Sequence, residues 1–388
     1  LVYGFDKWYK LFNPRQLLTL VTLVKLIREA GKKIEDEKLK EGLSKEEAFK
    51  YAEAVITYLA IALIEHARYN AIVASWNPTS WAKSKIRDVL SFRGIAMVWN
   101  FAEVPIHKRE DIMYSYAWSV KIEKDGLSYL VSAVSGSPSK VKVLLDDATM
   151  LSKLDDEKFD IIITDPPYYD DVPYAELSDF YYVWLKRALS DVENGRLKPR
   201  FLPEAFFEKI NDNWVEISTQ WEKYALSEVS LNPPRLGANA GREEGVAHFQ
   251  NLLNSSFVTM ASRLRDDGIL VTYYAHTSPE AWKALLKAGW ESAGFRVTNA
   301  FPLATESAQS VVSRGKLSMD TSIVVVWRKT ATEEVAEASK LYDEMVEVAA
   351  KRARELIEAG WVGRDLVIGT LAAALSVATK YKEVRVMG

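Results

Sequence analysis

The sequence predicts an α/β fold with helical segments before and after it, and two observations lead to this prediction. Short apolar runs of strand length alternate with longer helical patterns, and they lie at residues 141–145, 159–163, 269–274, 295–300 and 321–326. The run at 159–163 is typical of a buried parallel strand, and two successive prolines follow it closely. Ligands of open α/β sheets bind beyond the carboxyl ends of the strands, so the loop after this strand is the first candidate site.

The composition is that of a globular protein and excludes several kinds of site. A chain of 388 residues allows two to three domains or one large elaborated domain. Its net charge of −3 gives no overall basic surface, so a nucleic-acid partner would need a local patch. The absence of cysteine excludes disulfides, a thiolate nucleophile and cysteine-bound zinc. The four histidines lie far apart without ligand spacing, so we expect no metal site.

Membrane association is not expected from this sequence. The most apolar helical stretch, residues 51–64, contains Glu53 and is too short to span a bilayer. The chain begins without a secretory signal, and the lack of cysteine favours an intracellular setting. We therefore expect a soluble, cytoplasmic protein.

Residues 1–135 are predicted to form a helical and mixed region that could take part in target recognition. Asn13 and Pro14 form a helix start, and Gly31 is the expected stop of that helix. Ser44 and Glu47 form a capping box that opens a second helix. Aromatic and basic residues then mix in a stretch that forms either a nucleic-acid face or a solvated helix with buried tryptophans: Trp76, Trp81, Lys83, Lys85, Arg87 and Arg93.

Residues 136–330 form the predicted α/β domain, which follows a turn cluster at 135–139. The strand at 141–145 is expected to lead through Asp147 into a short helix near Met150. Longer helices are expected at residues 174–189, 244–264 and 278–292. Weak periodicity marks residues 191–245 as an insertion, and two further helices form a C-terminal appendage at 331–388 that packs on the domain or docks a partner.

The stretch Asp165-Pro166-Pro167-Tyr168 is the strongest candidate for a site. Each proline fixes its own φ and disfavours helix for the residue before it, so the chain leaves the strand stiff and extended. A rigid loop that carries a carboxylate, carbonyl groups and an aromatic face is suited to hold a planar, polar molecule. The alternative is that the stretch only ends a strand.

The spacing of this stretch resembles the catalytic motif of amino-group methyltransferases, which use S-adenosylmethionine (AdoMet). The resemblance extends to large prokaryotic adenine-specific DNA methylases that carry a zinc ribbon, and four stretches carry it: residues 165–174 with 178–185, 11–18, 97–103 and 273–276. It implies a class I, Rossmann-like methyltransferase fold, AdoMet as methyl donor and DNA as partner, with N6-adenine as acceptor. RNA or N4-cytosine is the alternative acceptor.

The resemblance also implies roles for individual residues. The Asp165 carboxylate and the Pro166 carbonyl would accept the two N–H groups of the target amine, and Tyr168 would stack on the extruded base. Tyr169 and Tyr174 would shape the pocket. The family usually has Asn where this chain has Asp171, so hydrogen-bond donation at that position is not implied.

One expected motif is missing. The glycine-rich Phe-x-Gly-x-Gly turn, which lets the backbone approach the methionine part of AdoMet, does not occur in this sequence. In the resembled family the turn lies in an N-terminal half. We therefore expect an incomplete methyltransferase sheet, with the missing half belonging to a longer protein or to a separate AdoMet-binding chain. Asp147 and Ala148 remain as cofactor-binding candidates, although Asp147 equally fits as the cap of its own helix.

Three further residues have two interpretations each. Arg235 and Arg242 lie in a stretch rich in proline and glycine that either binds phosphate groups or is a flexible connection. His276 lines the pocket or is a structural histidine. A different class of function also stays open, namely a catalytically silent module that binds nucleic acid or docks a partner through its C-terminal helices.

Overall fold

The chain folds into two compact units. The computed structural model describes residues 4–77, 85–91, 94, 95, 98–106, 109–167, 169, 172–274, 278–304, 321–330 and 332–386. Unit 1 combines Leu1–Val141 with Tyr174–Ala225, and unit 2 combines Lys142–Pro173 with Leu226–Gly388. The α/β domain predicted at 136–330 is thus divided between the units. The predicted C-terminal appendage belongs to unit 2.

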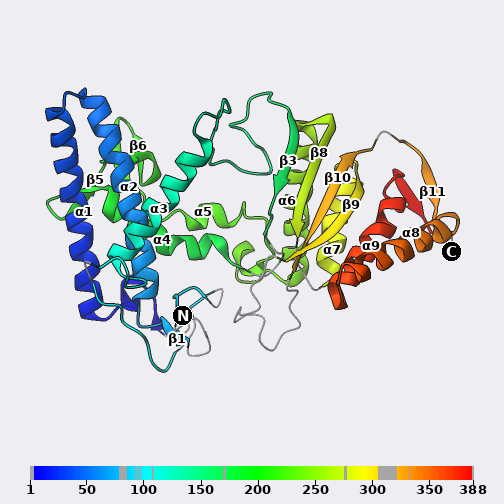
Figure 1. Ribbon diagram of the computed structural model, residues 1–388, viewed down its shortest axis with the longest axis horizontal. Coiled ribbons are helices and arrows are strands. Elements are labelled where there is room, and N and C mark those ends of the chain that lie inside the picture. The colour runs from blue at the N-terminus through cyan, green and yellow to red at the C-terminus, as the bar shows by residue number, and fades with distance from the viewer. Residues whose placement is uncertain are drawn as a thin grey trace. The chain divides into compact units, whose positions relative to one another are not determined.

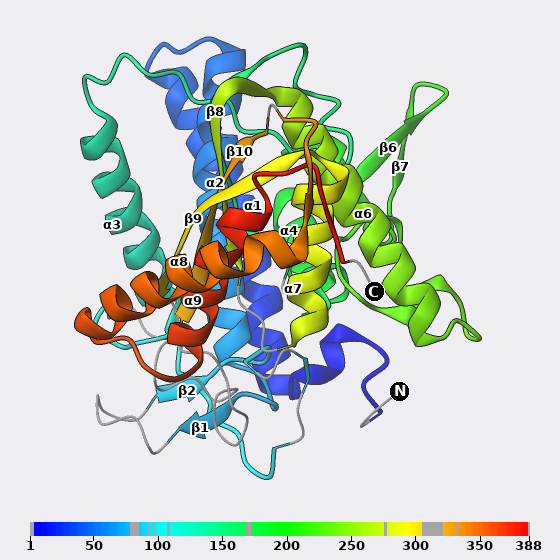
Figure 2. The ribbon, with the colours of Figure 1, turned by 90° about the vertical axis from the view of Figure 1, so that its right-hand side faces the viewer.

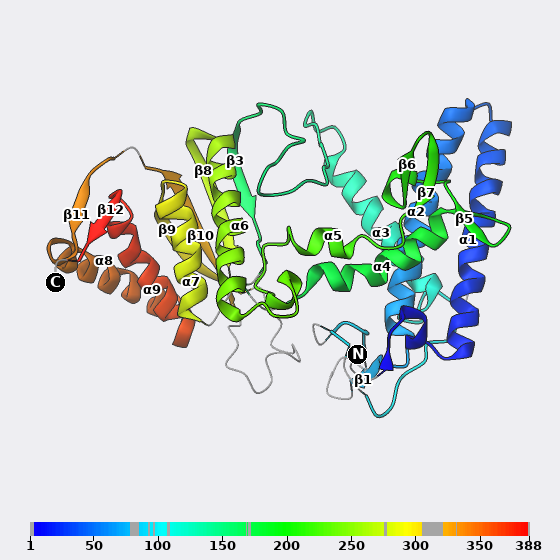
Figure 3. The same cartoon turned by 180° about the vertical axis from the view of Figure 1, so that it is seen from behind.

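Unit 1 is built on four long helices, shown in Figures 1 and 3: α1 (Pro14–Lys40), α2 (Lys45–Tyr69), α3 (Tyr116–Val134) and α4 (Tyr174–Leu189). Both predicted capping boxes are confirmed. The Asn13 side chain accepts a hydrogen bond from the backbone of Gln16, and Ser44 does the same with Glu47. These caps satisfy backbone N–H groups that a helix start leaves without partners.

The sequence predicted that the first helix stops at Gly31. This prediction is wrong, because α1 continues to Lys40. A Cβ atom at position 31 would lie 3.0 Å from the ring of Phe201 and 3.2 Å from Ile56. Gly31 therefore provides a close approach between packed elements and not a helix end.

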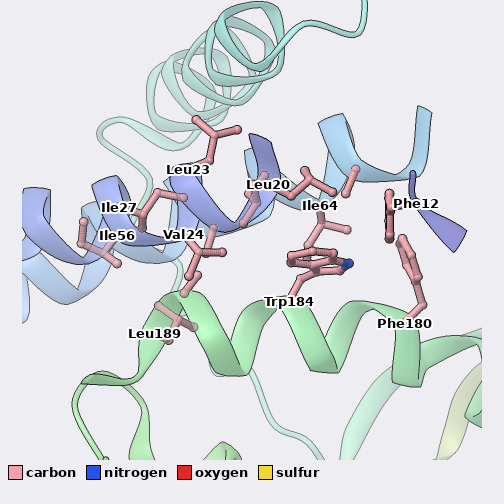
Figure 4. Packing of buried hydrophobic residues seen from close by; sticks show 14 of the residues in the cluster. Phe12, Leu20, Leu23, Val24, Ile27, Ile56, Ile64, Phe180, Trp184 and Leu189 are labelled. Atoms are coloured by element: carbon pink, nitrogen blue, oxygen red, sulfur yellow. The ribbon is translucent and has the colours of Figure 1, made fainter. Parts of the chain in front are cut away.

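Aromatic side chains of α4 fill the centre of the unit 1 core (Figure 4). Phe180 is fully buried, and Trp8 meets its ring edge-on with the two centroids 5.7 Å apart. Trp184 packs against Phe12 in the same manner, at 5.5 Å. Burial of such a side chain contributes about 1.5–3 kcal/mol. The core therefore holds α4 against the N-terminal helices.

The predicted insertion contains two antiparallel hairpins, β4 (Asp191–Glu193) with β5 (Arg196–Lys198) and β6 (Phe207–Ile210) with β7 (Asn213–Glu216). The short helix α5 (Trp221–Ala225) follows them. Lys186 of α4 reaches this segment. Its buried Nζ donates to the carbonyls of Ile217 and Ser218 and lies 2.9 Å from Glu216.

A third hairpin in unit 1 lies where aromatic and basic residues mix. It pairs β1 (Ser75–Asn77) with β2 (Lys85–Arg87), so residues 75–77 and 85–87 are strands and not helical. Trp76 is exposed on it. Trp81, Lys83 and Arg93 lie outside the described residues, and the nucleic-acid interpretation stays a prediction.

Unit 2 contains a four-stranded mixed sheet, which confirms the predicted α/β class. The strand order is β3 (Phe159–Thr164), β8 (Leu264–Tyr274), β10 (Thr321–Lys329) and β9 (Phe295–Ala304). Strands β3 and β8 are parallel, whereas β10 runs antiparallel to both of its neighbours. The carboxyl ends of β3 and β8 consequently lie at the same edge of the sheet.

The helices of unit 2 are shown in Figure 2: α6 (Arg242–Arg263), α7 (Pro279–Leu286), α8 (Ala338–Glu358) and α9 (Gly363–Ala378). The helix predicted at 278–292 is α7 continued by a π-helix, Lys287–Ser292. The two C-terminal helices pack against each other, and α9 also packs on β9. A short parallel pair, β11 (Val335–Glu337) with β12 (Glu383–Arg385), lies beside them. No helix among the described residues is both long and apolar enough to cross a membrane.

Three expectations for the start of unit 2 are wrong. Residues 141–145 form no strand, and Val143 is 89% exposed. Strand β3 is not buried on both faces, because it pairs with β8 alone in the described sheet and Ile161 and Ile163 are 57% and 67% exposed. The helix expected near Met150 is only a turn. The apolar pattern thus predicted β3 correctly as a strand but predicted a strand at 141–145 wrongly, and β3 has a neighbour on one side only among the described residues.

Candidate active site at the end of strand β3

The candidate loop follows β3 at its carboxyl end, as predicted. Asp165 is exposed there, and Pro166 and Pro167 are half-buried. Tyr168, Asp170 and Asp171 lie outside the described residues, so the stacking role of Tyr168 stays a prediction. The loop lies next to the carboxyl end of β8, because the two strands are parallel.

The start of the loop is fixed by the sheet. Thr164 pairs with Thr272 in the parallel ladder, and its Oγ1 donates at 3.4 Å toward the Thr272 hydroxyl and the Val271 carbonyl. Thr272 is fully buried. The residue immediately before Asp165 therefore has a defined position.

The far end of the loop is fixed by Tyr169. Its ring is only 3% exposed and meets Phe249 of α6 edge-on, with the ring centroids 4.9 Å apart. Its backbone N–H donates to the Pro167 carbonyl at 3.0 Å, and its own carbonyl accepts from Leu231 N–H at 2.8 Å. Its φ of +56° is uncommon for a residue with a side chain and is maintained by these contacts.

The expected pocket role of Tyr169 is corrected by this arrangement. Its ring packs into the core of unit 2 and anchors the loop, because an aromatic side chain gains more from burial than from exposure at a loop surface. With Thr164 at one end and Tyr169 at the other, the loop holds the exposed Asp165 carboxylate in a restricted position. Such an arrangement can accept hydrogen bonds from a polar, planar molecule.

The segment 228–236 supports this anchor and was not recognised from the sequence. Arg235 is buried and forms an ion pair with Glu228 at 3.0 Å, and it donates to the Ser230 hydroxyl at 2.9 Å. Both interpretations of Arg235 are corrected. Its guanidinium is paired with Glu228 inside unit 2 and is not directed at a phosphate group, and its segment is packed and not a flexible connection. Only the opposite charges of Glu228 and Arg235 could have suggested the pair.

Arg242 differs from Arg235. It is exposed in the first turn of α6, after the Gly241–Glu244 backbone cap. Its accessibility is compatible with the predicted phosphate contact, which stays a prediction.

Asp147 caps a turn. Its Oδ1 accepts from the Thr149 N–H at 2.7 Å and from the Thr149 hydroxyl at 2.6 Å, while the Thr149 carbonyl accepts from Thr259 of α6. The preceding Asp146 accepts from the Lys153 N–H, and this backbone hydrogen bond lowers the pKa of Asp146. The predicted capping role is thus present, although in a turn and not at a helix start. Ala148 belongs to the same turn.

Two candidates remain. Tyr174 is exposed at the first position of α4 in unit 1. His276 lies outside the described residues. Their predicted contacts with a base stay predictions.

Comparisons with known proteins add no assignment. No model of a protein family matches the chain, and no match was found among curated proteins or solved structures. The function is therefore argued from the residues and their geometry.

Proposed function

We propose that this chain provides the target-base side of an AdoMet-dependent methyltransferase that acts on an exocyclic amino group, with N6-adenine in DNA as the preferred acceptor. The observation that carries the proposal is the exposed Asp165, which lies between Thr164, held by the sheet, and Tyr169, held by the core of unit 2. The order of elements in unit 2, strand and helix alternating before two final strands, also supports a class I sheet.

The chemistry needs such a loop because an exocyclic amino nitrogen is a weak nucleophile. Its lone pair is delocalised into the aromatic ring of the base. A carboxylate at Asp165 and a carbonyl at Pro166 can accept its two N–H bonds and favour a pyramidal nitrogen with a directed lone pair. This is catalysis by orientation and fixed electrostatics, and it requires no general base.

The described residues do not form a complete site for AdoMet. The Oδ1 of Asp147 already accepts two hydrogen bonds from Thr149, and the sequence has no Phe-x-Gly-x-Gly turn. We therefore assign no step of the reaction to the cofactor within this chain. The proposal includes a further polypeptide segment, in the same protein or a separate one, that binds the donor.

The test is methyl transfer from radiolabelled AdoMet to adenine-containing duplex DNA, with the protein produced together with the products of neighbouring genes. Asp165→Ala should lower the rate by about 10²–10³-fold, since it removes a group aimed at the reacting nitrogen. Asp160→Asn is the matched control, because Asp160 is an exposed carboxylate on β3 that pairs with Arg265. Wild-type rates in Asp165→Ala would refute the proposal.

Mass spectrometry of the product nucleosides identifies the acceptor. N6-methyladenine in DNA is expected. Methylated cytosine, or methylation of RNA only, would move the proposal to the alternative acceptors while keeping the reaction class.

A second candidate function is a catalytically silent docking module. The exposed apolar side chains of β3 and of residues 141–145 favour it, because they suit contact with another protein segment. Calorimetry with AdoMet separates the candidates. Micromolar binding supports an enzyme, whereas no binding and no transfer in the complete assembly supports the module.

A further inference from the structure

Unit 2 contains a cavity of about 500 Å³ that shares no residue with the loop after β3. It lies between the sheet strands β9 and β10, the helix α7 with its π-helical continuation, and the helix α9. Its volume falls within the range of about 300–1,000 Å³ that is typical of small-molecule sites.

The wall of this cavity is mostly apolar. Three tryptophans from different elements contribute to it: Trp282 of α7, Trp290 of the π-helix and Trp327 of β10. Leu375 and Ala372 of α9 line the opposite part. Large aromatic faces together with aliphatic side chains suit an apolar occupant.

The local backbone is unusual where it lines the cavity. The π-helix Lys287–Ser292 continues α7 and ends it, and π-helical turns are frequent at functional sites. Gly289 lies against Trp327, where a Cβ atom would come within 2.8 Å of the indole ring. Glycine at this position lets the π-helix and the indole approach each other closely, so the wall depends on a specific residue.

The indole N–H groups of two lining tryptophans differ. Trp327 is fully buried, and its Nε1 has no acceptor among the described residues. The Trp290 Nε1, in contrast, donates to the Tyr381 carbonyl at 2.7 Å. A buried N–H without an acceptor is destabilising, and this one has no surface that a molecule in the cavity could reach, so it adds nothing to binding.

Charged groups also line the cavity. Lys283 and Lys287 are exposed, are one helical turn apart, and form no ion pair within the part of the chain that the structure describes. Glu291 is the acidic residue of this lining, so the three groups sum to one positive charge. An anionic group on the occupant would be attracted to this side.

We propose that this cavity is a binding site for a small apolar organic anion, with the apolar part among the tryptophans and the anionic group toward Lys283 and Lys287. This binding site shares no residue with the loop proposed for methyl transfer, so the two proposals are tested separately.

The probe is decanoate, a medium-chain carboxylate, added to the full chain. Quenching of tryptophan fluorescence and calorimetry should both report binding, because three tryptophans line the cavity. Decanol, which has the same chain without the charge, should bind more weakly. The double variant Lys283→Gln/Lys287→Gln should weaken the binding of decanoate by about two- to tenfold. Lys351→Gln, on α8 outside the lining, is the matched control and should bind as wild type.

Filling the cavity tests its location. Ala372→Phe should abolish binding while the melting temperature shows a folded protein, and Leu375→Trp repeats the test at another point of α9. Three results would overturn the proposal: no decanoate binding at millimolar concentration, unchanged affinity in a folded filling variant, or equal affinity for decanoate and decanol.

Discussion

The apolar residues of α4 in unit 1 and of β3 in unit 2 have opposite surroundings. Phe180 and Trp184 are buried by helices from the N-terminal part of the chain, whereas Ile161 and Ile163 remain more than half exposed at the sheet edge. Each exposed side chain of this size forgoes about 1.5–3 kcal/mol of burial energy. Unit 1 thus buries these apolar side chains of α4 within the chain, whereas the described part of unit 2 leaves Ile161 and Ile163 for another segment to cover.

Two buried polar side chains of unit 1, His66 and Lys186, have hydrogen-bond partners inside the unit. His66 has no exposed surface, and its Nδ1 hydrogen-bonds the Tyr114 carbonyl at 2.8 Å while its Nε2 faces the Asn70 amide at 3.4 Å. Because the Tyr114 carbonyl can only accept and the Asn70 amide donates, the His66 imidazole is neutral with its proton on Nδ1. The buried Lys186 is likewise surrounded by carbonyls and a carboxylate. A unit organised in this way is sensitive to small internal changes.

The largest expected effect is the loss of the Phe180 ring. Phe180→Ala should destabilise unit 1 by about 3–5 kcal/mol, because it opens a cavity in a closed core. The matched change in unit 2, Ile163→Ala, should cost about 0.5 kcal/mol or less, since the side chain is largely in water. Hydrogen exchange measured on peptides from α4 and from β3 reports each unit separately.

Equal losses of stability in Phe180→Ala and Ile163→Ala would contradict the contrast between a buried α4 and an exposed β3. They would mean that Ile163 is covered in solution by something that binds the edge of β3. Size-exclusion chromatography of both variants then identifies whether the cover is a second copy of the chain.

A smaller effect is expected from pH through His66. Burial lowers the pKa of His66 below its ordinary value of 6.5, so the unfolded state binds the proton more readily. Stability should be full above about pH 6.5 and should fall as the pH drops below it, by up to about 1.4 kcal/mol per pH unit.

His66→Gln tests this assignment because glutamine does not titrate. The variant should lose this part of the pH dependence in thermal melts of unit 1 between about pH 6.5 and 5. An unchanged slope would show that another group is responsible.

The smallest expected effect concerns Asp147 in unit 2. Asp147→Ala removes the acceptor of two hydrogen bonds from Thr149 and should cost about 0.5–1.5 kcal/mol. Asp147→Asn keeps an oxygen acceptor and should stay within about 0.5 kcal/mol of wild type. Urea unfolding followed by circular dichroism measures both. A large loss in Asp147→Asn would show that the charge itself matters for the turn.

The candidate site was only partly predictable. The Asp-Pro-Pro sequence fixes a stiff loop after a strand because proline restricts the backbone locally, and the position of Asp165 followed from that alone. The anchoring of Tyr169 by Phe249 and Leu231 joins parts of the chain that are distant in sequence. No local pattern could have distinguished a tyrosine in the core from a tyrosine on a pocket wall.

Local chemistry determined where several of the helices and strands of this protein begin. The caps at Asn13 and Ser44, the proline pair and the apolar periodicity act within a few residues, so they are legible in the sequence. Tertiary structure alone decided that Gly31 is a packing contact, that Arg235 is in an internal ion pair and that β3 lies at the edge of the sheet formed by the described residues. Each of these three outcomes depends on which distant segment of the chain packs against the residue or strand. The energies of burial and strand pairing depend on that segment as much as on the residue itself.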